Sequence, residues 1–454
     1  MTKTKPIKVG FFHPDLGIGG AERLVVDAAM ALRSKGCDVR MYTSHHDPTH
    51  CFPETLPGTG PLPVEVHGDW LPRKLFGRFH IVFAILRSLW LVLRLSVLRT
   101  GPNQLRDLDV AFVDQVSAPV PLIRLLSGGK TKVLFYCHFP DKYLANRTVA
   151  LKETKVSLAK RLYRVPFDKI EDLTTGKADK ILVNSNFTAC AFRGAFAGMS
   201  EPEILYPSIN MGLFEKNYQE ARRFAGEKTN ACLCDVIPDF PADVGHSANA
   251  KDAKILLSIN RFERKKDIAL AIKMLASLRE KFPDAYERAH LVVAGGYDPR
   301  VAENVNYKKE LETLAEELGL SQKVTMVLNF SDLQRSALLA RSACLIYTPQ
   351  NEHFGIVPVE AMFSYVPVVA ANSGGPCESV ADGLTGFLCE PNADAFAQAV
   401  SRIVMDEGMA KKMGEAAHQR TIDMFSFESF TEQLYGIVRS MMMSSKNNET
   451  KKEK

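Results

Sequence analysis

The sequence predicts an α/β protein built from two successive doubly wound domains. Short apolar segments alternate with segments whose apolar residues recur at helical spacing, and this alternation begins at Lys8 and restarts at Lys254. Between the two runs, residues 225–253 are polar, contain prolines and show no periodicity, as is typical of a connection between domains. A chain of 454 residues also exceeds one ordinary core, since a domain usually holds about 100–200 residues.

Composition and charge narrow the classes of function. Apolar residues make up 46% of the chain and charged residues 24%, which is typical of a globular protein. A net charge of +5 is too small for a polyanion such as nucleic acid to be the main partner, but it suits an anionic substrate or a membrane surface. The nine cysteines show no repeated metal-ligand spacing, so we expect free thiols. The first residues resemble a β-strand rather than a signal peptide, because their apolar run is short.

The first domain opens with a β–α–β unit that has a glycine-rich turn. The strand 8–13 is followed by Gly17, Gly19 and Gly20, then by a helix and a second strand at 37–43. Glycines let the backbone approach a ligand closely, and a helix N-terminus favours an anion. The spacing fits neither the dinucleotide G-x-G-x-x-G motif nor the P-loop. The turn is therefore a candidate ligand contact, and the alternative is a tight connection without ligand.

Residues 81–98 form the most hydrophobic segment. It carries Arg87 and Arg94, which lie on one helix face because they are seven residues apart. Each arginine would cost about 2.5–3.5 kcal/mol at the centre of a membrane span. We therefore expect an amphipathic helix in a membrane interface, edged by these arginines, rather than a transmembrane helix. The alternative is a helix buried against the domain.

Two further strands are predicted at 108–114 and 132–139, and a third begins at 180–183. His138 stands at the carboxyl end of the second of these strands, which is the edge where α/β sheets bind ligands. His138 is therefore a candidate site residue, and the alternative is a structural histidine. This first, acceptor-side domain is expected over 1–210, with a connecting segment over 211–253.

The second half repeats the alternation. Its strands are expected at 254–259, 290–296, 323–330, 343–349 and 366–372, with helices between them and a short strand that begins at Gly386. The second domain is therefore expected over 254–442, and we expect its last helix to pack back on the first domain. The polar tail over 443–454 is expected to be disordered.

A strand–loop–helix corner over 349–367 carries two carboxylates. Glu352 is expected in the loop and Glu360 in the first turn of the following helix, with Gly355 between them. This corner lies at the carboxyl end of a strand, where ligands bind in open α/β sheets. Gly374 and Gly375 follow the next strand in the same way.

A cationic pair follows the first strand of the second domain. Arg261 and Lys266 are five residues apart, and a planar guanidinium beside a point charge suits a diphosphate. The alternative for this stretch is a solvated basic cluster.

Together these motifs, over residues 7–440, resemble the retaining GT-B glycosyltransferases that use nucleotide-sugar donors. Several strings resemble the dolichol-pathway α-1,3/1,6-mannosyltransferases of N-glycan assembly, namely FFHPDLGIGGAERLVVDAA, FYCHFPDKYL, VNSNFTA, SINRFERKKDIALAI and EHFGIVPVEAM. The resemblance implies a GT-B fold, in which two Rossmann-like domains face each other across a cleft and the second binds the nucleotide sugar.

The resemblance also implies roles for the candidate residues. Glu360 would hold the ribose hydroxyls, and Glu352 would lie beside the hydroxyls of the transferred sugar. Arg261 and Lys266 would hold the donor diphosphate, and His138 would lie near the transferred sugar. The glycines would give backbone room around donor or acceptor, namely Gly19, Gly20, Gly355, Gly374 and Gly375. One residue departs from the pattern, because Asp267 stands where related sequences commonly have glycine.

The implied activity is mannosyl transfer from GDP-mannose to a lipid-linked oligosaccharide, a dolichyl diphosphate glycan bearing one mannose on chitobiose. Two additions, α-1,3 and α-1,6, would give the trimannosyl core. No metal or cofactor is expected, and the implied location is the cytosolic face of the endoplasmic reticulum membrane, near other glycosyltransferases of the pathway. The alternatives are a GT-B enzyme with another donor or acceptor, and a non-catalytic membrane scaffold.

Overall fold

A computed structural model describes residues 5–74, 79–97, 104–146, 158–209, 216, 233–238, 240–241, 244 and 253–452. The chain divides into two compact units. Unit 1 comprises Met1–Ser208 and Phe427–Lys454, and unit 2 comprises Ile209–Ser426. Most of the connecting segment expected at 211–253 lies outside the described residues.

The sheet of unit 1 is parallel throughout. Its described strands are β1 (Lys8–His13), β2 (Asp38–Thr43), β3 (Val64–Val66), β4 (Val110–Asp114), β5 (Lys132–Cys137), β6 (Lys180–Val183) and β7 (Glu203–Ile204). They lie in the order β3-β2-β1-β4-β5-β6-β7, so the direction of winding reverses between β1 and β4. Ligands of open α/β sheets bind at the carboxyl ends of the strands at such a reversal.

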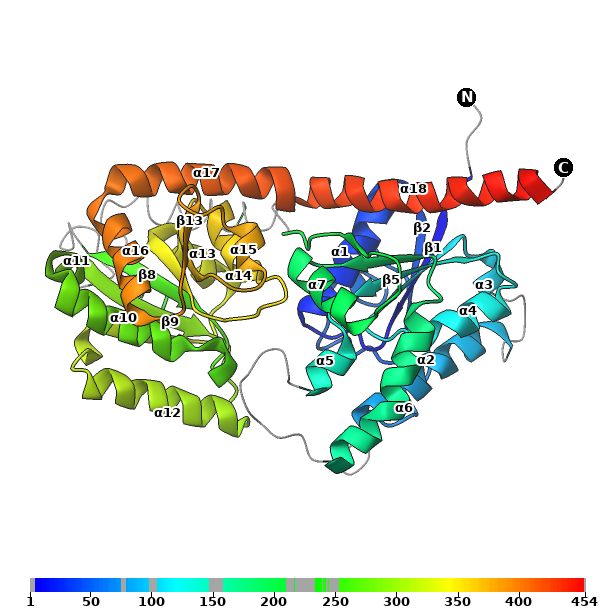
Figure 1. Ribbon diagram of the computed structural model, residues 1–454, viewed down its shortest axis with the longest axis horizontal. Helices are drawn as coiled ribbons and strands as arrows, with labels where there is room; N and C mark the ends of the chain where they lie inside the picture. The colour runs from blue at the N-terminus through cyan, green and yellow to red at the C-terminus, as the bar shows by residue number, and fades with distance from the viewer. Residues whose placement is uncertain are drawn as a thin grey trace. The chain divides into compact units, whose positions relative to one another are not determined.

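Helices cover both faces of this sheet, because successive strand residues point to opposite sides (Figure 1). One face packs against α1 (Gly20–Ser34) and α18 (Phe427–Lys452). The other face packs against α2 (His80–Ser96), α3 (Gln104–Asp107), α4 (Val120–Leu126) and α7 (Asn186–Ala195). Two more helices, α5 (Asp141–Asn146) and α6 (Leu158–Thr175), follow β5 in the chain.

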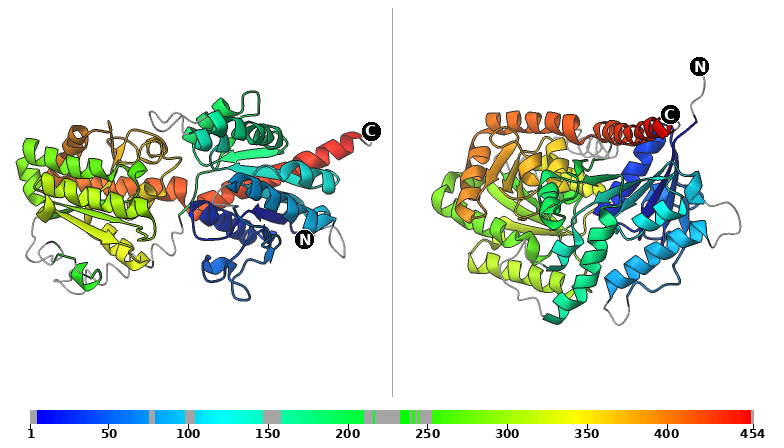
Figure 2. Two further views of the ribbon diagram at one scale, coloured as in Figure 1. Left: turned by 90° about the horizontal axis from the view of Figure 1, so that it is seen from below. Right: turned by 45° about the vertical axis from the view of Figure 1, so that its right-hand side comes forward.

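The last helix of the chain belongs to unit 1. α18 lies along α1 (Figure 1, Figure 2) and buries apolar side chains against it, namely Phe430, Leu434, Ile437, Val438 and Met441. The helix continues to Lys452, where the sequence led us to expect a disordered tail over 443–454. Extending a helix that is already packed costs much less than nucleating one, which explains how a polar segment can continue it.

α2 contains most of the hydrophobic segment predicted at 81–98. Its second half packs into the core of unit 1 through Leu91, Val92 and Leu95. Arg87 is also buried, and its Nη2 donates a hydrogen bond to the carbonyl oxygen of Ser44 at 2.9 Å.

The expectation that Arg87 edges a membrane face is therefore wrong, because its guanidinium is held by a backbone carbonyl just beyond the end of β2. The apolar side chain next to it, Leu86, is exposed instead. No helix in the described part of the chain combines the length and apolar character needed to cross a bilayer.

Unit 2 contains a second parallel sheet. Its described strands are β8 (Lys254–Ile259), β9 (Ala289–Gly295), β10 (Val324–Leu328), β11 (Ser342–Tyr347), β12 (Val368–Ala371) and β13 (Gly386–Cys389). They lie in the order β10-β9-β8-β11-β12-β13, so this sheet reverses between β8 and β11.

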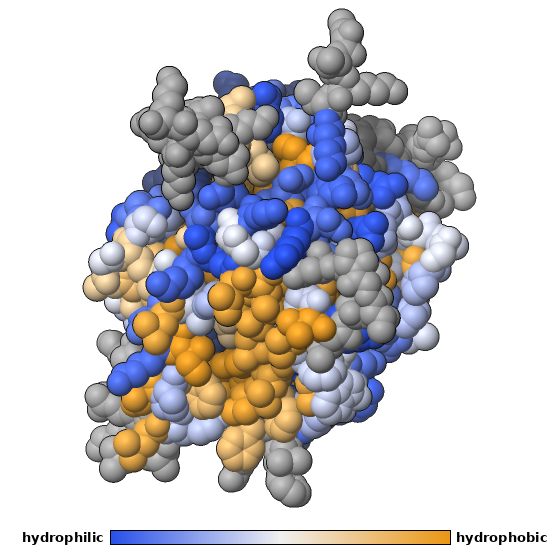
Figure 3. All heavy atoms as spheres, turned by 90° about the vertical axis from the view of Figure 1, so that its right-hand side faces the viewer, coloured by the Kyte–Doolittle hydropathy of each residue, from blue (hydrophilic) through white to orange (hydrophobic). Residues whose placement is uncertain are grey.

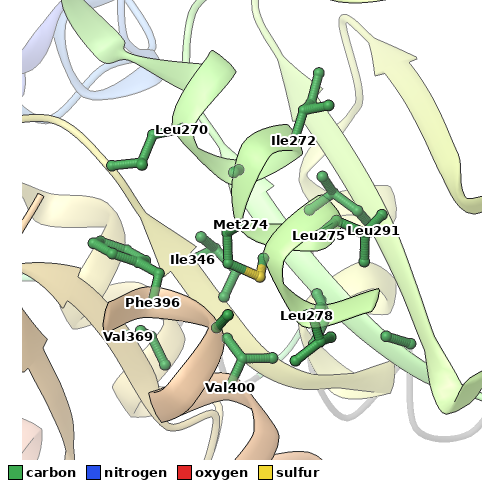
Figure 4. Close-up of a cluster of buried hydrophobic side chains, with 14 of the residues drawn as sticks. Leu270, Ile272, Met274, Leu275, Leu278, Leu291, Ile346, Val369, Phe396 and Val400 are labelled. Atoms are coloured by element: carbon green, nitrogen blue, oxygen red, sulfur yellow. The ribbon is translucent and has the colours of Figure 1, made fainter. Parts of the chain in front are cut away.

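Helices again cover both faces. One face packs against α10 (Ile268–Lys281), α11 (Pro283–Arg288), α12 (Ala302–Glu317) and α16 (Ala393–Met405). In Figure 4, Met274 of α10 lies among Ile346 of β11 and Phe396 and Val400 of α16. The other side of the unit holds α13 (Asp332–Arg341), α14 (Ile356–Phe363), α15 (Pro376–Ser379) and α17 (Glu407–Phe425).

The predicted fold class is confirmed, since each unit is a parallel sheet with helices on both faces. The predicted strands match the observed ones to within about two residues at their ends. α6 is not among the predicted elements, because Pro166 stands inside it and an interior proline usually indicates a break.

Cys234 is disulfide-bonded, which differs from the expected free thiols, whereas seven other cysteines are free.

Candidate active site

Lys266 and Glu352 meet at the reversal point of the unit 2 sheet. Lys266 ends a short 3₁₀ turn after β8, and Glu352 lies in the loop after β11. The Lys266 Nζ and the Glu352 Oε1 are 2.6 Å apart. The Lys266 side chain is 12% exposed and the Glu352 side chain 25%, so a ligand can reach this ion pair. Thr348, just beyond β11, donates its hydroxyl hydrogen bond to the carbonyl oxygen of Lys266 at 2.8 Å.

Asp267 follows Lys266, at the position where related sequences commonly have glycine, and its backbone conformation explains how it can replace glycine there. Asp267 has φ 48° and ψ 43°, which is the left-handed conformation that glycine adopts most readily. Aspartate is among the few other residues that tolerate this conformation. Asp267 can therefore form the same turn at the start of α10 as glycine would.

Glu360 is a buried carboxylate held by an arginine. Its Oε1 accepts a hydrogen bond from Nη1 of Arg335 on α13 at 3.0 Å. Burial raises the pKa of Glu360 above its usual value, and the Arg335 charge opposes this shift. Glu360 is the fifth residue of α14, so it lies in the second helical turn and not in the first turn as predicted.

Gly374 and Gly375 press against the backbone of the loop that carries Glu352. A Cβ at Gly374 would overlap the Glu352 carbonyl oxygen, and a Cβ at Gly375 would overlap the Phe354 carbonyl oxygen. The Gly375 N–H donates to the Glu352 carbonyl oxygen at 2.8 Å. These glycines therefore position the loop, which is a structural use of the close approach that glycine permits. Gly355 precedes α14 with φ 79° and lies beside the Tyr347 ring.

Arg261 has a different partner from Lys266. Its side chain is 63% exposed, and Nη1 lies 2.9 Å from Glu263 Oε1. Gly296 lies beside its aliphatic stem. The structure thus brings Lys266, Glu352 and the glycine pair together, while Arg261 pairs with Glu263 and has the freedom of an exposed side chain.

In unit 1, polar side chains meet at the carboxyl ends of β1, β4 and β5, and His138 is the one among them that the sequence predicted. His138 follows β5, and its Nε2 is 3.0 Å from Asp114 Oδ2 at the end of β4. The other oxygen of Asp114 is 2.7 Å from Nδ1 of His13, the last residue of β1. His13 and Asp114 are buried, and the carboxylate of Glu22 lies 3.8 Å from His13 Nε2.

The electrostatics of this group favour charged side chains. Burial alone lowers the pKa of His13, but the Asp114 charge and hydrogen bond, together with Glu22, outweigh burial and raise that pKa to about 10. Burial would raise the pKa of Asp114, yet His13 and His138 hold it below its usual value. His13 is therefore protonated at neutral pH and forms a buried ion pair with Asp114.

Gly19 and Gly20 begin α1 and leave open space. No atom lies within 4 Å of a Cβ built on Gly20, and a Cβ on Gly19 would meet mainly the flexible carboxylate of Glu22. Gly19 is the N-cap residue, with extended backbone. The space around these two glycines is compatible with a ligand at the helix N-terminus.

Three residues of these groups are absent from the sequence predictions. His13 and Asp114 end apolar strands, and a polar residue at the carboxyl end of a buried strand is a signal that could have revealed both. Arg335 has no such signal, because it is one charged residue on an amphipathic helix. In the part of the chain that the structure describes, no group of three or more His, Cys, Asp or Glu side chains is arranged to hold a metal ion.

Two family models match the chain. Residues 18–211 match "Glycosyltransferase Family 4", and residues 239–420 match "Glycosyl transferases group 1". The second match contains Lys266, Glu352 and Glu360, and the first contains His138 and the turn at Gly19.

Among solved structures, sucrose-phosphate synthase from Thermosynechococcus elongatus is similar with a TM-score of 0.69 at 19% identity, covering 96% of this chain and 100% of that one. WaaG, a glycosyltransferase of lipopolysaccharide biosynthesis, is similar with a TM-score of 0.60 at 17% identity, covering 95% and 99%. At these identities the likeness establishes the GT-B fold alone.

Relatives with much higher identity carry one name. "Alpha-1,3/1,6-mannosyltransferase ALG2" of Homo sapiens is 45% identical over 95% of this chain and 96% of its own length. The proteins of the same name from Dictyostelium discoideum and Candida albicans are 42% and 39% identical, over 96% and 95% of this chain and 99% and 98% of their own lengths. The chain therefore belongs to the ALG2 family of alpha-1,3/1,6-mannosyltransferases.

Proposed function

We propose that this enzyme transfers mannose from GDP-mannose to a dolichyl-diphosphate-linked oligosaccharide that bears one mannose on chitobiose. It would add an α-1,3 and an α-1,6 mannose, on the cytosolic face of the endoplasmic reticulum membrane. The relatives' names support the two linkages. The observation that carries the proposal is the accessible Lys266–Glu352 pair at the reversal point of the unit 2 sheet.

In this proposal Lys266 exchanges its partner when the donor binds. A diphosphate would draw the Lys266 ammonium away from Glu352, and Arg261 would join it from its exposed position. The Glu352 carboxylate would then accept hydrogen bonds from hydroxyls of the transferred mannose. Both cations face charge that grows on the leaving diphosphate, so they stabilise the transition state more than the ground state.

The proton of the acceptor hydroxyl would pass to a phosphate oxygen of the donor on the same face of the sugar. No protein base is then needed, and the two glutamates have no role as a glycosidase acid and nucleophile. Glu360 would instead accept hydrogen bonds from both ribose hydroxyls, with Arg335 holding its carboxylate in place. Two cations on the diphosphate supply the positive charge that a metal ion would otherwise provide, so we propose no metal or cofactor.

An apolar surface on unit 1 supports the membrane location. It consists of exposed side chains of α2, α4 and α6 and of the residue that follows α2, namely Leu86, Val97, Leu125, Leu162, Val165 and Leu173. These helices are neighbours, and Figure 3 shows apolar side chains gathered on the side of unit 1 where they lie. A lipid-linked acceptor requires the enzyme at a bilayer, and exposed apolar side chains on adjacent helices suit its interface.

A product assay tests the function. Radiolabelled GDP-mannose and the monomannosyl lipid-linked acceptor should give a product with two added mannoses, and UDP- or ADP-sugars should give none. Transfer from another nucleotide sugar would favour the alternative GT-B enzyme. No product at saturating donor would favour a non-catalytic scaffold.

A vesicle assay tests the membrane location separately. The Leu86→Glu/Leu162→Glu variant should lose cosedimentation with liposomes that carry anionic lipids, because both side chains belong to the apolar surface. Leu384→Glu is the matched control, since Leu384 is about as exposed as Leu162 but lies in unit 2. Unchanged partitioning of the double variant would contradict this part of the proposal.

A further inference from the structure

Asp114 joins two histidines from neighbouring strands. One oxygen pairs with His13 Nδ1 at 2.7 Å and the other with His138 Nε2 at 3.0 Å, so each carboxylate oxygen has its own imidazole. Asp114 is only 1% exposed, whereas the His138 side chain is 21% exposed. The arrangement therefore links a buried charge to a ring that a ligand can reach.

The charge state of Asp114 decides which nitrogen of His138 carries hydrogen. The ion pair with His13 keeps Asp114 ionised, and an ionised carboxylate can only accept hydrogen bonds. His138 must therefore donate from Nε2 to Asp114. In a neutral imidazole the other nitrogen, Nδ1, then carries the lone pair and can only accept.

Nδ1 is the atom of His138 that remains for a ligand. Among the described residues it has no hydrogen-bond partner. The Nε2 atom faces the buried Asp114, and the His138 side chain as a whole is 21% exposed. The backbone is fixed as well, because Asn184 Nδ2 donates to the His138 carbonyl oxygen at 3.2 Å.

From this geometry we infer that Asp114 is a positioning residue, which holds His138 in the Nε2–H tautomer so that Nδ1 accepts a hydrogen bond from a hydroxyl of the transferred sugar. His13 supports it as the buried counter-charge of Asp114. The inference rests on the proposed function for the identity of the sugar, while the tautomer is a property of the chain itself. A purely structural role for the ion pair would require no particular tautomer of His138.

The Asp114→Asn variant distinguishes a positioning role of Asp114 toward His138 from a purely structural role of the ion pair. The amide has one acceptor and one donor, so its two ends can no longer both accept from an imidazole. When the amide oxygen keeps the hydrogen bond from His13 Nδ1–H, the amide nitrogen faces His138 Nε2. The ring must then accept at Nε2 and carry its hydrogen on Nδ1. Asp109→Asn is the matched control, because Asp109 stands at the opposite end of β4 and caps the backbone N–H of Lys8.

The tautomer can be read by ¹⁵N NMR of chains labelled at histidine, with His138→Gln to assign the His138 signals. We expect Nε2–H in the wild type and in Asp109→Asn, and Nδ1–H in Asp114→Asn. With GDP-mannose and the lipid-linked acceptor, kcat of Asp114→Asn should fall about 10- to 100-fold, as expected for one lost hydrogen bond in a buried site, with a smaller change in KM.

An Nδ1–H tautomer of His138 in the wild type would overturn the inference, and this measurement does not depend on how well Asp114→Asn folds. Equal loss of activity in Asp109→Asn and Asp114→Asn would overturn it as well, since it would indicate a structural role alone. Absence of mannosyl transfer by the wild type would contradict the proposed function, and the tautomer would still decide the role of Asp114.

Discussion

The two units use paired glycines at the start of a helix in opposite ways. In unit 1, Gly19 and Gly20 begin α1 and have open space or a flexible carboxylate around them. In unit 2, Gly374 and Gly375 precede α15 and lie against the backbone of Glu352 and Phe354. The same sequence pattern leaves room for a ligand in one unit and supports a loop in the other. Only the packing around the missing Cβ distinguishes the two uses.

The largest effect on activity is expected at Lys266, the cation that pairs with Glu352 in the loop supported by Gly374 and Gly375. Lys266→Ala should lower kcat/KM for GDP-mannose by about 10²–10³-fold, the usual cost of losing one group that stabilises transition-state charge. Lys265→Ala is the control, because Lys265 is exposed and pairs with Glu263. Steady-state kinetics measures both. Equal activities would mean that Lys266 does not serve the diphosphate.

The next effect concerns the supporting glycine itself. Gly375→Ala should destabilise unit 2 by about 3 kcal/mol, because the methyl group overlaps the Phe354 carbonyl oxygen and the backbone must shift. Thermal unfolding followed by calorimetry measures this change, and transferase activity should fall with it because Glu352 moves. Wild-type stability and activity would show that the loop adapts without cost.

Unit 1 fixes its ligand loop with a carboxylate rather than with glycines. The Glu171 carboxylate of α6 accepts hydrogen bonds from the backbone N–H groups of Asp141 and Lys142, with N···O distances of 2.7 and 3.0 Å. Both residues lie in the segment that follows His138. Burial is the main reason that the pKa of Glu171 rises to about 7, the Asp141 charge adds to it, and the backbone donors oppose it.

Because the folded-state pKa of Glu171 is raised, its contribution to stability is complete below about pH 4.5 and is lost as pH rises through about 7. Glu171→Gln has no charge to bury. The unfolding free energy of the variant relative to the wild type should therefore increase by about 2–3 kcal/mol between pH 4.5 and 8. Denaturant titrations at several pH values measure this, and a difference independent of pH would contradict it.

The smallest effect is expected at the open glycine pair. Gly20→Ala should change stability by less than about 0.5 kcal/mol, since nothing lies within 4 Å of the added methyl group and alanine favours a helix. The acceptor or donor KM should rise if a ligand uses this space, and kinetics with both substrates varied measures it. A large loss of stability would remove the distinction between the two glycine pairs.

The elements that the sequence predicted correctly are those with strong local patterns. Buried strands such as β1 and β8 are continuous apolar runs, and their carboxyl ends indicated where Lys266 and Glu352 would lie. The partners in space were not predictable in this way. Arg335 reaches Glu360 across 25 residues, and no local pattern carries that information.

The sequence also could not distinguish polar side chains that stabilise the fold from those that are candidates to contact a ligand. Arg87 appeared to edge an apolar helix, but it binds a carbonyl oxygen 43 residues earlier. His138 was a candidate because of its strand end, whereas Asp114 and His13 became recognisable only through their hydrogen bonds. The roles of the site residues stay predictions until the variants are measured.

The return of α18 to unit 1 has a consequence for biosynthesis. A ribosome that has reached Ser426 has already synthesised every residue of unit 2, but unit 1 still lacks the helix that covers α1. Domains generally fold as units during synthesis, so the unit that starts second can finish first. Until residues 427–441 emerge, the nascent chain exposes the apolar side of α1, and a chain cut short there would present that surface to chaperones and proteases.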